Sequence, residues 1–104
     1  MKPSLRLAIA AALAALLAAP AIADSYVLLG AGVCRKAGEA TGEVYSYKNW
    51  SWERCREACS SRSCSGVEYN LRGDRSTCEH HYYPVKLKKA EVNGAVLSCW
   101  ARQN

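Results

Sequence analysis

Six cysteines and a pair of histidines are the side chains of this sequence that are best suited to chemistry. An even number of cysteines can form three disulfides, whereas free thiolates can bind a metal or attack a substrate. Spacing alone leaves fifteen possible disulfide pairings. The cysteines are Cys34, Cys55, Cys59, Cys64, Cys78 and Cys99.

Cys55 and Cys59 restrict these pairings because they lie four residues apart in a segment that favours a helix. Side chains at this spacing share one helix face with Cβ atoms roughly 5–6 Å apart. A disulfide needs about 3.5–4.5 Å between its Cβ atoms, so Cys55 and Cys59 should not bond each other. The geometry favours nearby Cys64 as the partner of Cys59.

A zinc site is the main alternative for the same cysteines, since cysteine thiolates and a histidine such as His80 can form a tetrahedral set. An oxidising compartment converts thiols to disulfides, and the N-terminal segment described below indicates export. We therefore expect no metal and no cofactor.

His80 and His81 are adjacent, and neighbouring residues of a strand point to opposite faces. The two rings then cannot act on one substrate atom, and no serine-centred or paired-carboxylate pattern accompanies them. We expect one packed histidine, one exposed histidine and no enzymatic activity.

Residues 1–23 have the features of a signal peptide. Lys2 and Arg6 precede an apolar run, and Ala21-Ile22-Ala23 matches a cleavage site of the A-x-A type. The apolar run is shorter than the roughly 20 residues that span a membrane. The sequence predicts cleavage after Ala23 and a secreted or periplasmic protein without a membrane span.

The remaining residues, 24–104, suffice for one small domain. Loss of Lys2 and Arg6 lowers the formal net charge from +5 to +3, a mild basic bias that suits acidic glycans without requiring them. A core of this size rarely supplies more than about 3–5 kcal/mol, so covalent cross-links should contribute much of the stability.

The elements that position these side chains follow from periodicity and turn signals. Ser51 can cap the N-terminus of a helix that contains the two spaced cysteines. Glu53 would lie in the first turn, where a negative charge is favourable. Alternation predicts strands around it, with a loop over Arg35 to Gly42. The expected fold is α+β, with a single short helix on a small antiparallel sheet and three disulfides. The expected strands are 26–33, 43–47, 66–70, 77–83, 85–88 and a last strand through 99–100.

The cysteine spacing resembles the PAN/apple family over residues 26–101. Its most specific part is Cys55-x-x-x-Cys59 in a helix, then Cys64-Ser-Gly-Val-Glu-Tyr69. The chain departs from the family pattern at His80, where an apolar residue is usual. The resemblance implies a PAN/apple-like domain over 24–104 with nested bridges, namely Cys34–Cys99, Cys55–Cys78 and Cys59–Cys64.

The resemblance also implies a non-catalytic binding module that recognises a carbohydrate, such as an acidic glycan, or an extracellular protein. The alternative is a small secreted effector or enzyme inhibitor on the same disulfide scaffold. We expect no nucleic-acid partner.

Two groups of residues are candidates for the binding surface. The first is basic and would gather near one end of the sheet: Arg72, Arg75, Lys86 and Lys88. The second is aromatic and could stack on a sugar or a protein: Tyr45, Tyr47 and Trp50.

Overall fold

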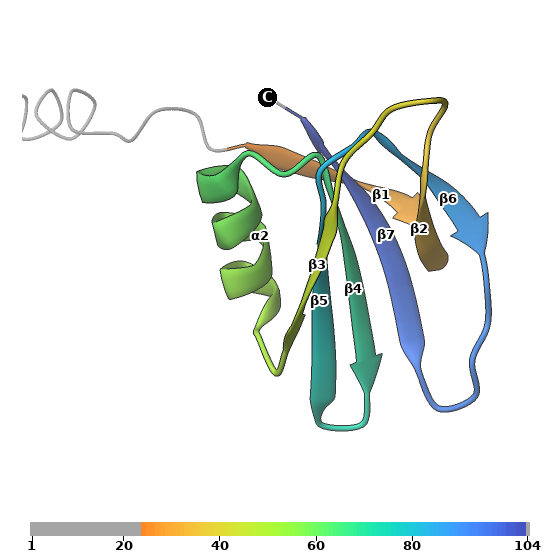
Figure 1. The fold of residues 1–104 in the computed structure, drawn as a ribbon. Helices are drawn as coiled ribbons and strands as arrows, with labels where there is room; N and C mark the ends of the chain where they lie inside the picture. The colour runs from red at the N-terminus through yellow and green to blue at the C-terminus, as the bar shows by residue number, and fades with distance from the viewer. Residues whose placement is uncertain (1–23, 104) are drawn as a thin grey trace, which may run out of the picture.

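The computed structural model describes residues 24–103, so the predicted signal peptide and its cleavage site lie outside the described residues. Within that range no helix has the length and apolar character needed to cross a membrane. The elements, shown in Figure 1, are β1 (Ser25–Gly30), β2 (Gly32–Lys36), β3 (Val44–Lys48), α2 (Trp52–Arg62), β4 (Gly66–Arg72), β5 (Arg75–His81), β6 (Val85–Lys89) and β7 (Val96–Gln103).

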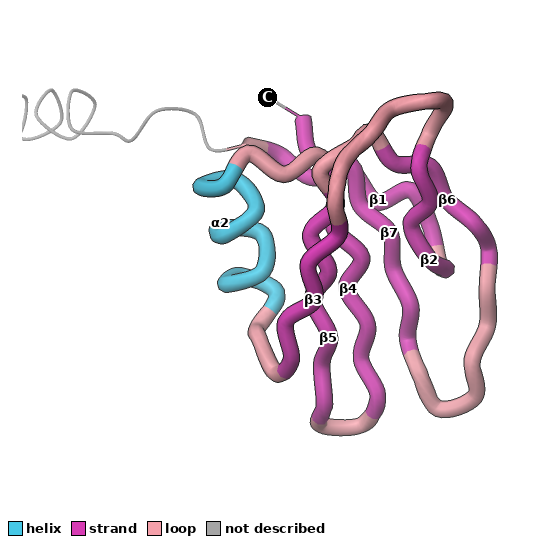
Figure 2. The backbone as a smooth tube through the Cα atoms, in the orientation of Figure 1, coloured by secondary structure: helices cyan, strands magenta, loops and turns pink. Residues whose placement is uncertain are grey.

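The fold is α+β and has three layers. The central layer is a five-stranded sheet in the order β1-β7-β4-β5-β3, and a second sheet pairs β2 with β6. All strand pairs are antiparallel. Helix α2 packs mainly over β4 and β5 on one face of the central sheet, and the small sheet lies on the other side (Figure 2).

Helix α2 has the predicted start. The Ser51 hydroxyl accepts a hydrogen bond from the Arg54 N–H at 3.1 Å, and Glu53 lies in the first turn near the positive end of the helix dipole. Ser63 ends the helix in the left-handed conformation, with φ of 60°. This reversal brings Cys64 back to Cys59.

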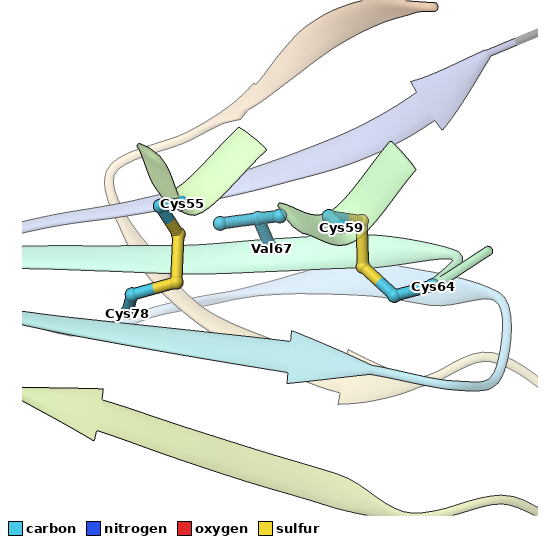
Figure 3. Close-up of a cluster of buried hydrophobic side chains, with 5 residues drawn as sticks. All are labelled: Cys55, Cys59, Cys64, Val67 and Cys78. Carbon is cyan, nitrogen blue, oxygen red and sulfur yellow. A yellow bond between two sulfur atoms is a disulfide. The ribbon is translucent and has the colours of Figure 1, made fainter. Parts of the chain in front are cut away.

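The core between α2 and the sheet consists largely of disulfides. Cys55 is bonded to Cys78 and Cys59 to Cys64, and Val67 lies between the two bridges (Figure 3). Among residues 24–103, Val67 is the only fully buried apolar side chain that is not a cysteine. Half-buried aromatic rings surround this cluster, as expected for a chain without Phe: Tyr26, Tyr47, Trp50, Trp52, Tyr69, Tyr82 and Trp100.

The third bridge, Cys34–Cys99, holds the small sheet against the opposite face of the central sheet. Buried Glu68 supports this contact, because its carboxylate accepts the Cys34 N–H at 2.7 Å. The three bonds are the nested pairs that the PAN/apple resemblance implies.

The predicted strand over 26–33 is in fact two strands in different sheets. Gly30 and Gly32 adopt φ of 148° and 146°, a region that favours glycine. The chain therefore leaves the central sheet after β1 and starts β2. As β2 extends to Lys36, the predicted loop begins two residues later than expected.

Candidate functional site

A shallow groove of about 720 Å³ lies beside β3, one of the two edge strands of the central sheet. Tyr45 and Tyr47 are two residues apart on β3 and so share the face that the alternation predicts. Because α2 packs mainly over β4 and β5, the side chains of β3 remain accessible. The groove is lined by Gly42, Glu43, Tyr45, Tyr47, Arg62 and Tyr82, which we call the aromatic groove.

Tyr47 forms one wall of the aromatic groove and is stacked on Trp50, which does not line the groove itself. The rings of Tyr47 and Trp50 lie 4.1 Å apart at 12° to each other. The Arg54 guanidinium lies 4.2 Å from the Trp50 ring centre, a cation–π contact. Arg62 lies 5.2 Å from the centre of the Tyr47 ring and donates to the Tyr47 hydroxyl at 2.7 Å.

The backbone behind this stack is also held firmly. Asn49 has φ of 63°, and this tight turn returns Trp50 toward β3. The Trp50 carbonyl accepts hydrogen bonds from the hydroxyls of Tyr69 and Ser76, each at 2.7 Å. The wall is therefore already ordered before any ligand arrives.

The more open part of the groove contains Tyr45 and Tyr82, whose rings meet edge to face at 5.6 Å. Tyr45 is 47% exposed. Its hydroxyl donates to the Glu43 carboxylate, and this hydrogen bond and the nearby negative charge raise the pKa of Tyr45. The groove thus combines an exposed aromatic face with a carboxylate and a guanidinium at its rim.

The basic candidates do not lie together. Arg72 and Arg75 flank the β4–β5 turn and line a polar groove of about 760 Å³. Lys86 and Lys88 lie on β6 in the small sheet. β5 ends at His81, and residues 82–84 lead to β6 in the other sheet, so the four cations are divided between two sheets.

The two histidines point to opposite faces of β5, as predicted. His80 is fully buried, and its Nε2 lies 2.8 Å from the Cys55 carbonyl, to which it donates in the neutral form. Burial lowers the pKa of His80. Its ring lies 5.1 Å from that of Tyr47, so it packs behind the aromatic groove and does not line it.

The expected exposure of the second histidine was wrong. His81 is only 3% exposed and contacts the Tyr83 hydroxyl at 3.1 Å and the Glu79 carboxylate at 3.4 Å. The sequence did not indicate that the small sheet would lie on the His81 face of the central sheet.

Two clusters of potential metal ligands occur in the described residues, one with Cys55, Cys78 and His80 and one with Cys34, Glu68 and His81. In both, the cysteine sulfur belongs to a disulfide. A disulfide sulfur is not the thiolate that binds metals, which leaves only His80 in the first cluster and only Glu68 and His81 in the second.

Of the predicted aromatic residues, Tyr45 and Tyr47 line the groove, whereas Trp50 stacks on Tyr47 without lining it. The sequence did not indicate four other lining residues, namely Gly42, Glu43, Arg62 and Tyr82. Tyr82 could have been found, since the alternation expected for a strand over 77–83 puts it on the face of Cys78 and His80, although β5 itself ends at His81. Arg62 joins the site only because the last turn of α2 ends near β3, a placement that local sequence patterns do not specify. Comparison of the chain with known family models, curated proteins and solved structures found no match.

Proposed function

We propose that this protein is a secreted, non-catalytic binding module of the PAN/apple type and that the aromatic groove recognises a carbohydrate. Export follows from the signal-like residues 1–23 and accords with three disulfides. The PAN/apple assignment rests on the cysteine spacing and on the nested bridges around one helix.

The observation that carries the proposal is the exposed Tyr45 ring beside the preformed Tyr47–Trp50 stack. The apolar C–H face of a sugar ring can pack on such an aromatic face, while polar groups around it hold the hydroxyls. Glu43 supplies an acceptor at the rim and Arg62 supplies donors. Because the wall is ordered by cation–π contacts and backbone hydrogen bonds, little side-chain entropy is lost on binding.

The shape of the groove also favours a sugar. A drug-like apolar ligand needs a pocket that covers most of its surface, whereas this groove is open along the β3 edge. An oligosaccharide can lie in an open groove with one ring stacked and the rest in water.

The mature protein, residues 24–104, should be screened on a glycan array, and each hit should be measured by titration calorimetry. Tyr45→Ala should weaken binding about tenfold or more, since loss of an aromatic contact of roughly 1.5 kcal/mol corresponds to that factor. Tyr45→Phe keeps the ring and should bind nearly as the parent does.

Leu28→Ala is the matched control, because Leu28 is 52% exposed on β1 at the opposite edge of the sheet. All variants should show the parent circular dichroism spectrum. An array without hits, or equal losses for Tyr45→Ala and Leu28→Ala, would contradict carbohydrate binding at the groove. A pull-down that captures one protein through Tyr45 would replace the sugar with a protein partner.

A further inference from the structure

The small sheet carries an unusual concentration of positive charge. Its two strands contain five basic residues, all exposed, and no acidic residue. We call this surface the basic ribbon, and it consists of Arg35, Lys36, Lys86, Lys88 and Lys89.

The register of the ribbon places three of these charges on its outer face. Cys34 and Leu87 are paired across the two strands, and Cys34 is buried in its bond to Cys99. The neighbouring pair Arg35 and Lys86 must therefore point outward. Lys88 follows two residues later on the same face, roughly 7 Å along the strand.

This arrangement is unfavourable in the free protein. Arg35 and Lys86 are direct cross-strand partners, and like charges in such positions destabilise a sheet. Among the described residues, no carboxylate forms an ion pair with any cation of the ribbon. A bound anion would relieve the repulsion.

The backbone beneath these charges is fixed. The Cys34–Cys99 bridge and the hydrogen bond from the Cys34 N–H to Glu68 hold β2 on the central sheet. Gly32 allows close pairing with β6, because a Cβ there would lie 2.2 Å from the Lys88 carbonyl oxygen. The two strands that carry the charges are therefore held in place on the central sheet.

We propose that the outer face of the basic ribbon binds a linear anionic polysaccharide. The match is electrostatic: a row of cations on an extended surface suits a chain with regularly spaced carboxylates or sulfates. The ribbon presents no aromatic side chain on which single-stranded bases could stack. Disulfides persist in oxidising compartments outside the cytosol, which favours polysaccharide over nucleic acid. This site is separate from the aromatic groove and does not depend on the function proposed for it.

The decisive variant is Lys86→Glu, because the proposal predicts that it changes affinity and stability in opposite directions. It removes a central cation of the site but converts the Arg35–Lys86 repulsion into an attractive pair. Affinity for alginate and for dextran sulfate should fall about tenfold or more, while the melting temperature should rise by about a degree or more. The affinity of the variant should also depend less steeply on salt concentration than the affinity of the parent does.

Arg72→Glu is the matched control, since it makes the same charge change on an exposed residue of the β4–β5 hairpin. It should weaken binding to these probes much less. Neutral dextran should not bind the ribbon, and Tyr45→Ala should leave alginate binding intact, so the failure of one site is distinguishable from the failure of the other.

Three results would overturn the proposal. The first is no binding of alginate or dextran sulfate at physiological salt. The second is an equal loss of affinity for Lys86→Glu and Arg72→Glu, which would show a response to net charge alone. The third is tighter binding of duplex DNA than of either polysaccharide at the same salt concentration.

Discussion

Removal of the Cys55–Cys78 bridge, by Cys55→Ala together with Cys78→Ala, tests how far disulfides stabilise this domain. The bridge closes a separation of 23 residues, for which the chain-entropy model gives about 3.4 kcal/mol. The Cys59–Cys64 bridge inside that loop shortens it slightly and reduces this to about 3.2 kcal/mol. A domain of this size has a free energy of unfolding of roughly 4–12 kcal/mol, so the variant should fold but only marginally.

The Cys59–Cys64 bridge provides an internal comparison, removed by Cys59→Ala with Cys64→Ala. It closes a separation of only 5 residues, which corresponds to about 2.1 kcal/mol. All four cysteines are fully buried, so the cavities left by the sulfur atoms should be similar in both variants. Each variant keeps the bridge that the other lacks, so the difference between them is that between about 3.4 and about 2.1 kcal/mol, or about 1.3 kcal/mol, and reflects loop length.

Urea unfolding followed by circular dichroism measures both free energies. The first variant should be less stable than the second by about 1.3 kcal/mol, which amounts to roughly 5–10 °C in melting temperature for a domain of this size. The m-value of the first variant should also increase more than that of the second, because loss of the longer loop exposes a longer segment of the unfolded chain. Equal losses in the two variants, or a greater loss for the shorter loop, would refute the reasoning.

Two further predictions concern the junction between the two sheets and the start of the helix. Burial raises the pKa of Glu68 in the folded protein. Protonated Glu68 therefore contributes its full share to the free energy of unfolding below the pKa of the unfolded state, and this contribution is lost as pH rises through the pKa of the folded state. Glu68→Gln should therefore be more stable than the parent at pH 7.5 and converge with it near pH 4, as measured by urea unfolding at both values; a difference independent of pH would contradict this. Ser51→Ala removes the acceptor for the Arg54 N–H and should cost about 1 kcal/mol in thermal unfolding, whereas an unchanged melting temperature would show that the cap contributes nothing.

The sequence predicted those parts of the fold that depend on local patterns. The Ser51 cap and the spacing of Cys55 and Cys59 specify α2 and its buried face. The alternation through Tyr45 and Tyr47 specifies which side chains of β3 share a face. Each of these features depends on residues within a few positions of one another.

The small sheet could not be predicted in this way, because it pairs Gly32–Lys36 with Val85–Lys89, segments about fifty residues apart. Its position explains why His81 is buried and why the two pairs of basic candidates are separated. The composition of the aromatic groove was likewise incomplete from sequence, since Glu43 and Tyr82 meet only when β3 pairs with β5 and Arg62 joins them only when α2 is placed on the sheet.

The central claim is that the aromatic groove is the site of carbohydrate recognition, and chemical-shift mapping tests it most directly. A glycan identified on the array is titrated into ¹⁵N-labelled protein, residues 24–104. The account predicts that the largest shifts fall on the lining of the groove, at Glu43, Tyr45, Tyr47, Arg62 and Tyr82, and on the indole N–H of Trp50. Shifts concentrated instead on the β4–β5 turn or on β1, with the groove unperturbed, would contradict it.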